Sequence, residues 1–191
     1  MFTFTFYTQL KMLEKLKEFL LNRSIKKLRA GQKFETKFHN LDSAKNALIV
    51  FDASTETDYK KITSFIRYIQ EKGIKIRAVA YSDTKMVPHY CMQSMNYDFI
   101  CKSDINFFYK PKGVSITNVL SEKFDILIDL NINNHKTLKF YSAIANAELK
   151  ISVSSEEIEL FDLIFQPKDK KDLNNILKDL IHYMENLGKK L

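Results

Sequence analysis

Two aspartates lie near the ends of two apolar segments of the chain, and polar side chains follow both of them. Asp52 belongs to the segment ALIVFDA (47–53), and Asp129 belongs to the segment FDILIDLNI (124–132). The polar side chains that follow the two aspartates are Ser54, Thr55, Asn131, Asn133, Asn134 and His135. If the two segments lie side by side, these residues form one cluster, which is the candidate ligand-binding site of the chain.

Three interpretations fit this cluster. Two carboxylates with neighbouring oxygen donors suit Mg²⁺, which prefers oxygen ligands. The backbone amides at two helix N-termini would instead suit an anion, such as a phosphorylated ligand or a nucleotide. These two alternatives conflict, because carboxylates repel phosphate unless a metal ion lies between them. The third interpretation is structural: Ser54 or Thr55 and Asn134 cap helices, and both aspartates hold loop backbone.

Strands and helices that would position the cluster can be predicted from the pattern of apolar residues. Residues 47–53 are a compact apolar run, which is typical of a strand covered on both faces, and residues 75–82 are predicted to be the second strand. Between them an apolar stripe at helical spacing, closed by Gly73, predicts a helix and therefore a right-handed βαβ unit. Further strands are predicted at 97–101, 124–132, 149–154 and 161–166, and further helices at 8–30, 115–122, 135–146 and 169–187.

This alternation predicts an α/β fold, namely a Rossmann-like doubly wound, mostly parallel sheet of five or six strands with an added N-terminal helix. In such a sheet the strand order reverses at one point, and ligands bind outside the carboxyl ends of the two flanking strands. With 47–53 as the first strand and 124–132 as the fourth, Asp52 and Asp129 end neighbouring parallel strands. The candidate site depends on this arrangement.

The N-terminal part of the chain carries much of its positive charge. The 191 residues hold only 4 Gly and 3 Pro, which leaves no linker and predicts a single domain, 1–191, with a basic helical extension at 1–40. The formal net charge is +7. Residues 8–30 form an amphipathic pattern that favours a protein partner or self-association. Residues 2–6, FTFTF, are predicted to be an edge strand or a disordered lead-in.

Several functions are not expected from the sequence. Nucleic-acid binding is not expected, because zinc ligands, stacking motifs and a helix-turn-helix signature are absent. No apolar stretch reaches about 18 residues, so no membrane span is predicted. Cys91 and Cys101 are expected to be buried, reduced thiols of a cytoplasmic protein. The sequence also lacks a glycine-rich phosphate loop, a nucleophile motif and metal-ligand spacing, so no catalytic residue or metal site is assigned and no motif requires a cofactor.

Two resemblances add to this interpretation. The segments NALIVFDAST, KIRAVAYSD, SDINFFYKP and FDILIDL resemble a family of short uncharacterised bacterial α/β proteins common in Bacteroidetes, a kinship that implies cytoplasmic residence and no assigned activity. Residues 124–152 are similar to a strand–helix–strand in the N-terminal, Rossmann-like half of heptosyltransferase-type glycosyltransferases. That similarity implies the fold alone, because residues 52–55 lack the glycine of those enzymes and the chain has no room for their second domain.

The function predicted from the sequence is that of a non-enzymatic, cytoplasmic binding or interaction module, with residues 8–30 as the contact surface. The alternative is a small ligand-binding protein or enzyme that uses the strand ends at Asp52 and Asp129, with Mg²⁺ or a phosphorylated or nucleotide ligand.

Overall fold

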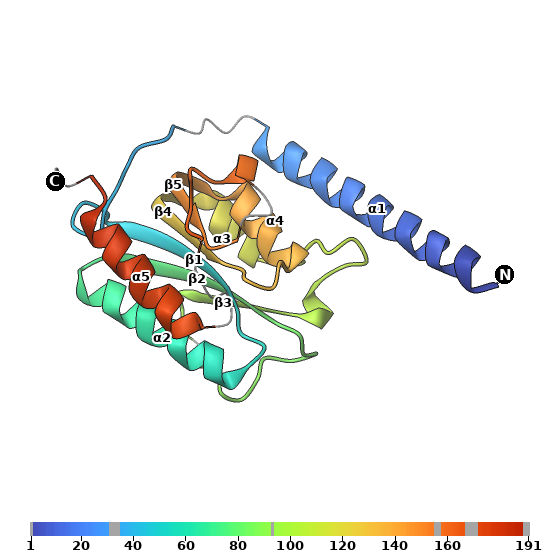
Figure 1. The fold of residues 1–191 in the computed structure, drawn as a ribbon, viewed down its shortest axis with the longest axis horizontal. Coiled ribbons are helices and arrows are strands. Elements are labelled where there is room, and N and C mark those ends of the chain that lie inside the picture. The colour runs from blue at the N-terminus through green and yellow to red at the C-terminus, as the bar shows by residue number, and fades with distance from the viewer. Residues whose placement is uncertain (1, 31–34, 93, 155–157, 167–171, 189–191) are drawn as a thin grey trace.

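The computed structural model describes residues 2–30, 35–92, 94–154, 158–166 and 172–188. Within these residues, six strands form one sheet in the order β3-β2-β1-β4-β5-β6, and every neighbouring pair is parallel (Figure 1). The strands are β1 (Asn46–Asp52), β2 (Lys75–Ser82), β3 (Tyr97–Cys101), β4 (Lys123–Leu130), β5 (Asn146–Ser152) and β6 (Leu163–Ile164). The predicted α/β fold with a parallel, Rossmann-like sheet is confirmed.

Helices cover both faces of this sheet. Two helices pack on one face, α2 (Glu56–Glu71) and α5 (Leu173–Asn186), and three pack on the other, α3 (Ser115–Ser121), α4 (Lys136–Ile144) and α1 (Phe2–Arg29) (Figure 1). Residues 48–51 of β1 are fully buried, because this central strand is covered from both sides. Its apolar run therefore needs no alternation of polar and apolar residues.

The helix that follows β1 begins and ends as its sequence predicts. Thr55 is the N-cap of α2, and its hydroxyl accepts a hydrogen bond from the Asp58 amide at 3.2 Å. Gly73 follows the helix with a φ of 86°, a left-handed conformation that favours glycine. These two signals fix the length of α2 and bring the chain back to the start of β2.

Some predicted boundaries are wrong. Helix α1 begins at Phe2, so residues 2–6 are neither an edge strand nor a disordered lead-in. The N-terminal half of α1 projects beyond the sheet, where it meets no edge of the described strands (Figure 1). Extending an existing helix by one residue is also easier than nucleating a new element. The strand predicted at 161–166 is reduced to Leu163–Ile164, and the start predicted for the last helix, residue 169, lies outside the described residues.

Helix α1 packs on the body through its C-terminal half. Leu21 and Ile25 are 2% and 7% exposed and belong to the core beneath α4, against which Leu28 also packs. Lys17, one turn earlier, lies over the rings of Phe107 and Tyr109. None of the described helices combines the length and the apolar character that crossing a bilayer requires.

Candidate functional site

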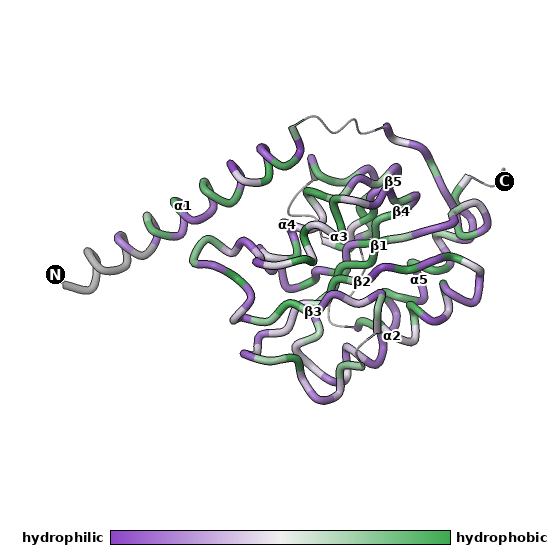
Figure 2. Tube along the Cα trace, turned by 180° about the vertical axis from the view of Figure 1, so that it is seen from behind, coloured by the Kyte–Doolittle hydropathy of each residue, from purple (hydrophilic) through white to green (hydrophobic). Residues whose placement is uncertain are grey.

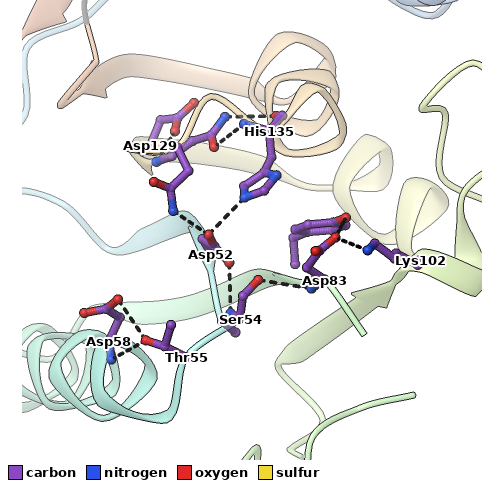
Figure 3. Close-up of polar contacts among 12 residues, drawn as sticks. Asp52, Ser54, Thr55, Asp58, Asp83, Lys102, Asp129 and His135 are labelled. Carbon is purple, nitrogen blue, oxygen red and sulfur yellow. Dashed lines mark hydrogen bonds and ion pairs between the residues drawn. The ribbon is translucent and has the colours of Figure 1, made fainter. Parts of the chain in front are cut away.

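The candidate site lies at the carboxyl edge of the sheet, where β1 and β4 run side by side. The two strands pair in parallel, with Val50 opposite Asp129 and Phe51 opposite Leu130. Strand order reverses between them, because β2 and β3 lie beyond β1 while β5 and β6 lie beyond β4. The topological prediction is therefore confirmed, and Asp52 and Asp129 end neighbouring strands at the same edge (Figure 3).

Asp52 makes hydrogen bonds to two loops, the loop after β4 and the start of the loop that follows β1. Its Oδ2 accepts hydrogen bonds from Asn133 Nδ2 at 2.7 Å and lies 2.9 Å from His135 Nε2, and its Oδ1 accepts from the Ser54 amide at 2.9 Å (Figure 3). Burial alone would raise the pKa of Asp52, but the hydrogen bonds from His135, Ser54 and Asn133 outweigh it and lower the pKa to about 2. Asp52 is therefore an ionised anchor.

Asp129 is a different kind of group, buried beneath α4. Its side chain accepts hydrogen bonds from the Asn131 amide at 2.8 Å and from Ser142 Oγ at 2.7 Å. Burial raises the pKa of Asp129 to about 6, although both hydrogen bonds favour the ionised form. The two carboxylates therefore accept hydrogen bonds from different residues.

The loop 131–135 is held by side chains from three strand ends. Asn131 closes the loop on itself, with Oδ1 accepting from the His135 amide at 2.8 Å and Nδ2 donating to the His135 carbonyl at 3.0 Å. Asn134 has a φ of 54° and its Oδ1 accepts from Ser154 Oγ at 2.7 Å. The predicted cap is therefore wrong: His135 is the N-cap of α4, and Asn134 occupies the left-handed conformation that asparagine tolerates.

Three residues at this edge, Tyr81, Asp83 and Lys102, were not predicted from the sequence. The ring of His135 packs on that of Tyr81, whose centroid lies 4.7 Å away, and Tyr81 donates a hydrogen bond to Asp83 at 3.2 Å. Asp83 pairs with Lys102 at 2.8 Å, and its amide donates to Ser54 Oγ at 3.0 Å (Figure 3). A signal existed, since Asp83 directly follows the strand predicted at 75–82, and Asp52 lies in the same way near the end of the strand predicted at 47–53.

Two cavities lie on either side of the loop 131–135. The first, of about 280 Å³, is at the ends of β4 and β5, and its polar lining includes Asp129, Asn131, Lys139 and Ser154. The second, of about 320 Å³, is at the ends of β2 and β3 and is lined by Tyr81, Asp83, Lys102 and His135, among others. Both are also lined by Asn134 and Lys136. The loop thus fills the crevice at the strand reversal and leaves a polar hollow on each side.

A buried lysine lies near Asp129 and shares a partner with it. Lys150 of β5 is 5% exposed, and its Nζ donates to the Ser142 carbonyl at 2.9 Å. Burial lowers the pKa of Lys150 to about 7, and the charge of Arg29 acts in the same direction. Ser142 of α4 therefore contacts both buried ionisable groups, the carboxylate through its hydroxyl and the amine through its carbonyl.

The comparison with known protein families assigns this chain to a family. A model of a family of unknown function, DUF6913, matches residues 17–187. The chain belongs to this family. No curated protein matches the sequence. The DUF6913 match contains both strand ends and the packed half of α1, and it supports the predicted kinship with an uncharacterised family.

One group of residues in this DUF6913 protein has the composition of a metal site, at the opposite edge of the sheet. Among the described residues, His39, Asp125 and Glu148 place one ligand atom each within 4.8 Å of the others. Glu148 already pairs with Lys123 at 2.6 Å and with His39 Nε2 at 2.6 Å, and Asp125 accepts from the Lys45 amide at 2.6 Å. These contacts give both carboxylates a structural role.

Proposed function

We propose that this DUF6913 protein is a non-enzymatic interaction module that attaches to its partner through α1. The observation that carries the proposal is a row of side chains, here called the outer stripe: Met12, Leu16, Phe19, Arg23 and Lys27. Its three apolar members are 67%, 51% and 62% exposed, which is unusual for large apolar residues at regular spacing on a helix. Figure 2 shows apolar segments along this projecting helix.

The outer stripe faces away from the body. Met12 and Leu21 are nine residues apart, and so are Leu16 and Ile25, a separation that at about 100° per residue places them on opposite sides of a helix. Leu21 and Ile25 are buried against the body. The apolar part of the outer stripe therefore has no role in the core, which supports a role in recognition.

The charges of α1 indicate the chemistry of the partner. The two acidic residues of the helix, Glu14 and Glu18, are held on the body side, where Glu14 pairs with Lys17 at 2.8 Å and Glu18 pairs with Lys136 at 2.6 Å. Arg23 and Lys27 of the outer stripe are exposed. A partner with acidic groups is therefore favoured over a second copy of the same stripe, which would bring like charges together.

We also propose that the chain forms a single domain, acts in the cytoplasm and comes from a bacterium of the Bacteroidetes type. Support for the location comes from Cys91 and Cys101, which are buried free thiols, a state that suits a reducing compartment. Support for one domain comes from the continuous six-stranded sheet. The origin, and a distant relation of residues 124–152 to heptosyltransferase-type enzymes, rest on the sequence resemblances alone.

Site-specific photocrosslinking in the native cells tests the role of α1. Full-length protein would carry a benzophenone amino acid at position 16 or 19, and the control would carry it at position 60 or 178, which are exposed on α2 and α5. We expect adducts from positions 16 and 19 only, and fewer of them when Arg23 and Lys27 are replaced by glutamate. Equal adducts from the control positions, or no adducts from α1 to either protein or lipid, would refute the proposal.

A second candidate function, binding of a small anionic ligand at the carboxyl edge, is favoured by the two cavities and by the lysines that line them. Lys136 and Lys139 line the first cavity and Lys102 lines the second. The lysines and the serine and asparagine side chains suit a phosphorylated ligand or a nucleotide better than they suit a free divalent cation. Asp129 and Asp83 limit how many charges such a ligand can place next to them.

Thermal-shift measurements with phosphate, nucleotides, sugar nucleotides and Mg²⁺ test this second function. A ligand at about 100 times its Kd adds about 2.7 kcal/mol to the free energy of unfolding, which raises the Tm of a chain this long by about 5–10 °C. The shift should disappear in Asn134→Gly, where glycine keeps the left-handed backbone, and in Lys136→Gln, while Lys60→Gln should retain it. A shift that survives both site variants would exclude the cavities.

A further inference from the structure

We infer that the surface to which the outer stripe binds is an anionic lipid bilayer. This inference rests on the proposed function of α1 and adds the chemistry of the partner. An interfacial helix needs an apolar face that enters the bilayer boundary, cations that reach lipid phosphates, and an approach that no other part of the protein blocks. The described part of α1 meets all three requirements.

The approach is open because the outer stripe and the packed face are opposed along the length of the helix. The pairs Met12 and Leu21, Leu16 and Ile25, and Phe19 and Leu28 are each separated by nine residues, or about half a turn of rotation. In Figure 1 the helix extends past the body toward the N-terminus. A flat surface can therefore lie against the whole stripe while the sheet stays on the far side of the helix.

The order of side chains along the stripe suits a bilayer. Met12, Leu16 and Phe19 are apolar, and Arg23 and Lys27 continue the same row with long cationic side chains. Lys11, Lys15 and Lys26 are exposed as well. Such side chains can keep their charge among headgroups while their methylenes cover apolar surface. Each basic residue near an anionic leaflet strengthens attachment, so the cations and the apolar residues act together.

Other occupants satisfy only part of the stripe. A second copy would place Arg23 and Lys27 against apolar or cationic side chains, because Glu14 and Glu18 are engaged on the body side. Nucleic acid would match the cations and leave Met12, Leu16 and Phe19 in water. A bilayer rich in phosphatidylglycerol offers an apolar interior beneath a layer of phosphates, and it matches both halves of the stripe.

Vesicle co-sedimentation of the full-length protein tests the inference. We expect binding to vesicles of phosphatidylcholine with about one-third phosphatidylglycerol, and at least tenfold weaker binding to vesicles of phosphatidylcholine alone. Salt should weaken binding to the vesicles that contain phosphatidylglycerol, because salt screens surface charges. Leu16→Glu with Phe19→Glu, and separately Arg23→Glu with Lys27→Glu, should each reduce binding at least tenfold. The matched control is Lys60→Glu with Lys178→Glu, which changes the net charge equally on the other face of the sheet and should retain binding.

A fluorescence readout reports insertion directly, because the chain contains no tryptophan. Phe19→Trp supplies a single reporter on the stripe, and Phe38→Trp supplies a matched reporter elsewhere, since the two phenylalanines are 62% and 64% exposed. Phosphatidylglycerol vesicles should shift the emission of the first to shorter wavelength and leave the second unchanged. Circular dichroism melts of every variant check that the body remains folded, which is expected because all of these positions are exposed.

The outcomes separate this inference from the proposed function. Absence of vesicle binding, together with stripe-dependent photocrosslinks to a protein, would overturn the bilayer and leave the interaction module in place. Binding that survives both stripe variants, or that the control variant also loses, would show attraction by net charge alone and would overturn the inference. Absence of both binding and crosslinks would overturn both proposals.

Discussion

At the scale of single residues, the carboxyl edge contains two aspartates that differ in state and in role. Asp52 accepts three hydrogen bonds from Ser54, Asn133 and His135 and is held ionised. Asp129 is buried and has a raised pKa. The sequence pattern predicted correctly that the two aspartates lie near the ends of neighbouring strands. The difference between their pKa values, however, depends on burial and on which side chains contact each of them. A chain order that places His135 83 positions after Asp52 does not reveal that contact.

The first residue-scale prediction concerns Asp52→Asn. The pKa of Asp52 is lowered to about 2, so its ionised form stabilises the fold at neutral pH, and that contribution is lost as the pH falls toward 2. We expect the variant to lower the free energy of unfolding by about 2 kcal/mol at pH 7, and by much less near pH 2. Urea titrations at both pH values measure the difference. Asp179→Asn, an exposed change on α5, should have an effect below about 0.5 kcal/mol, and an equal loss there would contradict the interpretation.

The second residue-scale prediction concerns the two buried groups joined by Ser142. Because the pKa of Asp129 is raised to about 6, the folded state binds an extra proton between about pH 4 and 6, and stability falls as the pH rises through that range. Because the pKa of Lys150 is lowered to about 7, the unfolded state binds the extra proton above that pH, and stability rises again.

Between pH 4 and 9, the combined contribution of these two groups to stability is therefore expected to be lowest between pH 6 and 7, where both groups are charged inside the protein. Asp129→Asn should remove the fall in stability that accompanies a rise in pH from 4 to 6. Lys150→Met should remove the increase in stability above pH 7. Each of these two changes in the free energy of unfolding should be on the order of 1–3 kcal/mol. Urea titrations of the wild type and both variants from pH 4 to 9 measure the two slopes. Parallel profiles for all three proteins would show that neither group titrates as described.

At the scale of elements, α1 has two faces that differ in what they contact. Ile25→Ala removes a side chain that is 7% exposed and should lower the free energy of unfolding by about 2–4 kcal/mol. Leu16→Ala, nine residues earlier on the opposite face, should change it by less than about 0.5 kcal/mol. Chemical denaturation compares the two truncations. A large effect of Leu16→Ala would mean that the outer stripe packs on the protein itself.

The elements also show what the sequence could predict. The runs at 47–53, 75–82 and 124–132 are rich in apolar residues, and each contains most of a largely buried parallel strand. The alternation in residues 2–6 has the period of a strand, yet these residues extend α1, because neighbouring elements decide between the two periods when a segment is short. The left-handed Asn134 depends on the loop that Ser154, Asn131 and Asp52 hold together, which no local pattern encodes.

At the scale of the whole molecule, a sheet that helices cover on both faces is joined to a helix, α1, of which only the C-terminal half packs on the body. Residues 48–51 of β1 are fully buried beneath helices on both faces, whereas Met12 and Leu16 extend into solvent. Local opening is easiest where few apolar contacts hold the backbone, so stability should be distributed unevenly between these regions. The cooperative unit is then the sheet with α2, α4, α5 and the C-terminal half of α1.

Native-state hydrogen exchange measures this distribution. We expect amides of residues 48–51 to exchange only through global unfolding, and amides of residues 9–16 to exchange at least a hundredfold faster, because Met12, Leu13 and Leu16 are exposed and a helix with few packing contacts is marginal in water. Leu21 and Ile25, which pack on the core, should mark the change from fast to slow exchange within α1. Phosphatidylglycerol vesicles should slow the amides of residues 9–16 and leave those of β1 unchanged. Equal protection along the whole of α1 in the absence of vesicles would show that its N-terminal half is already stabilised without a partner, which removes the physical reason for the outer stripe to bind one.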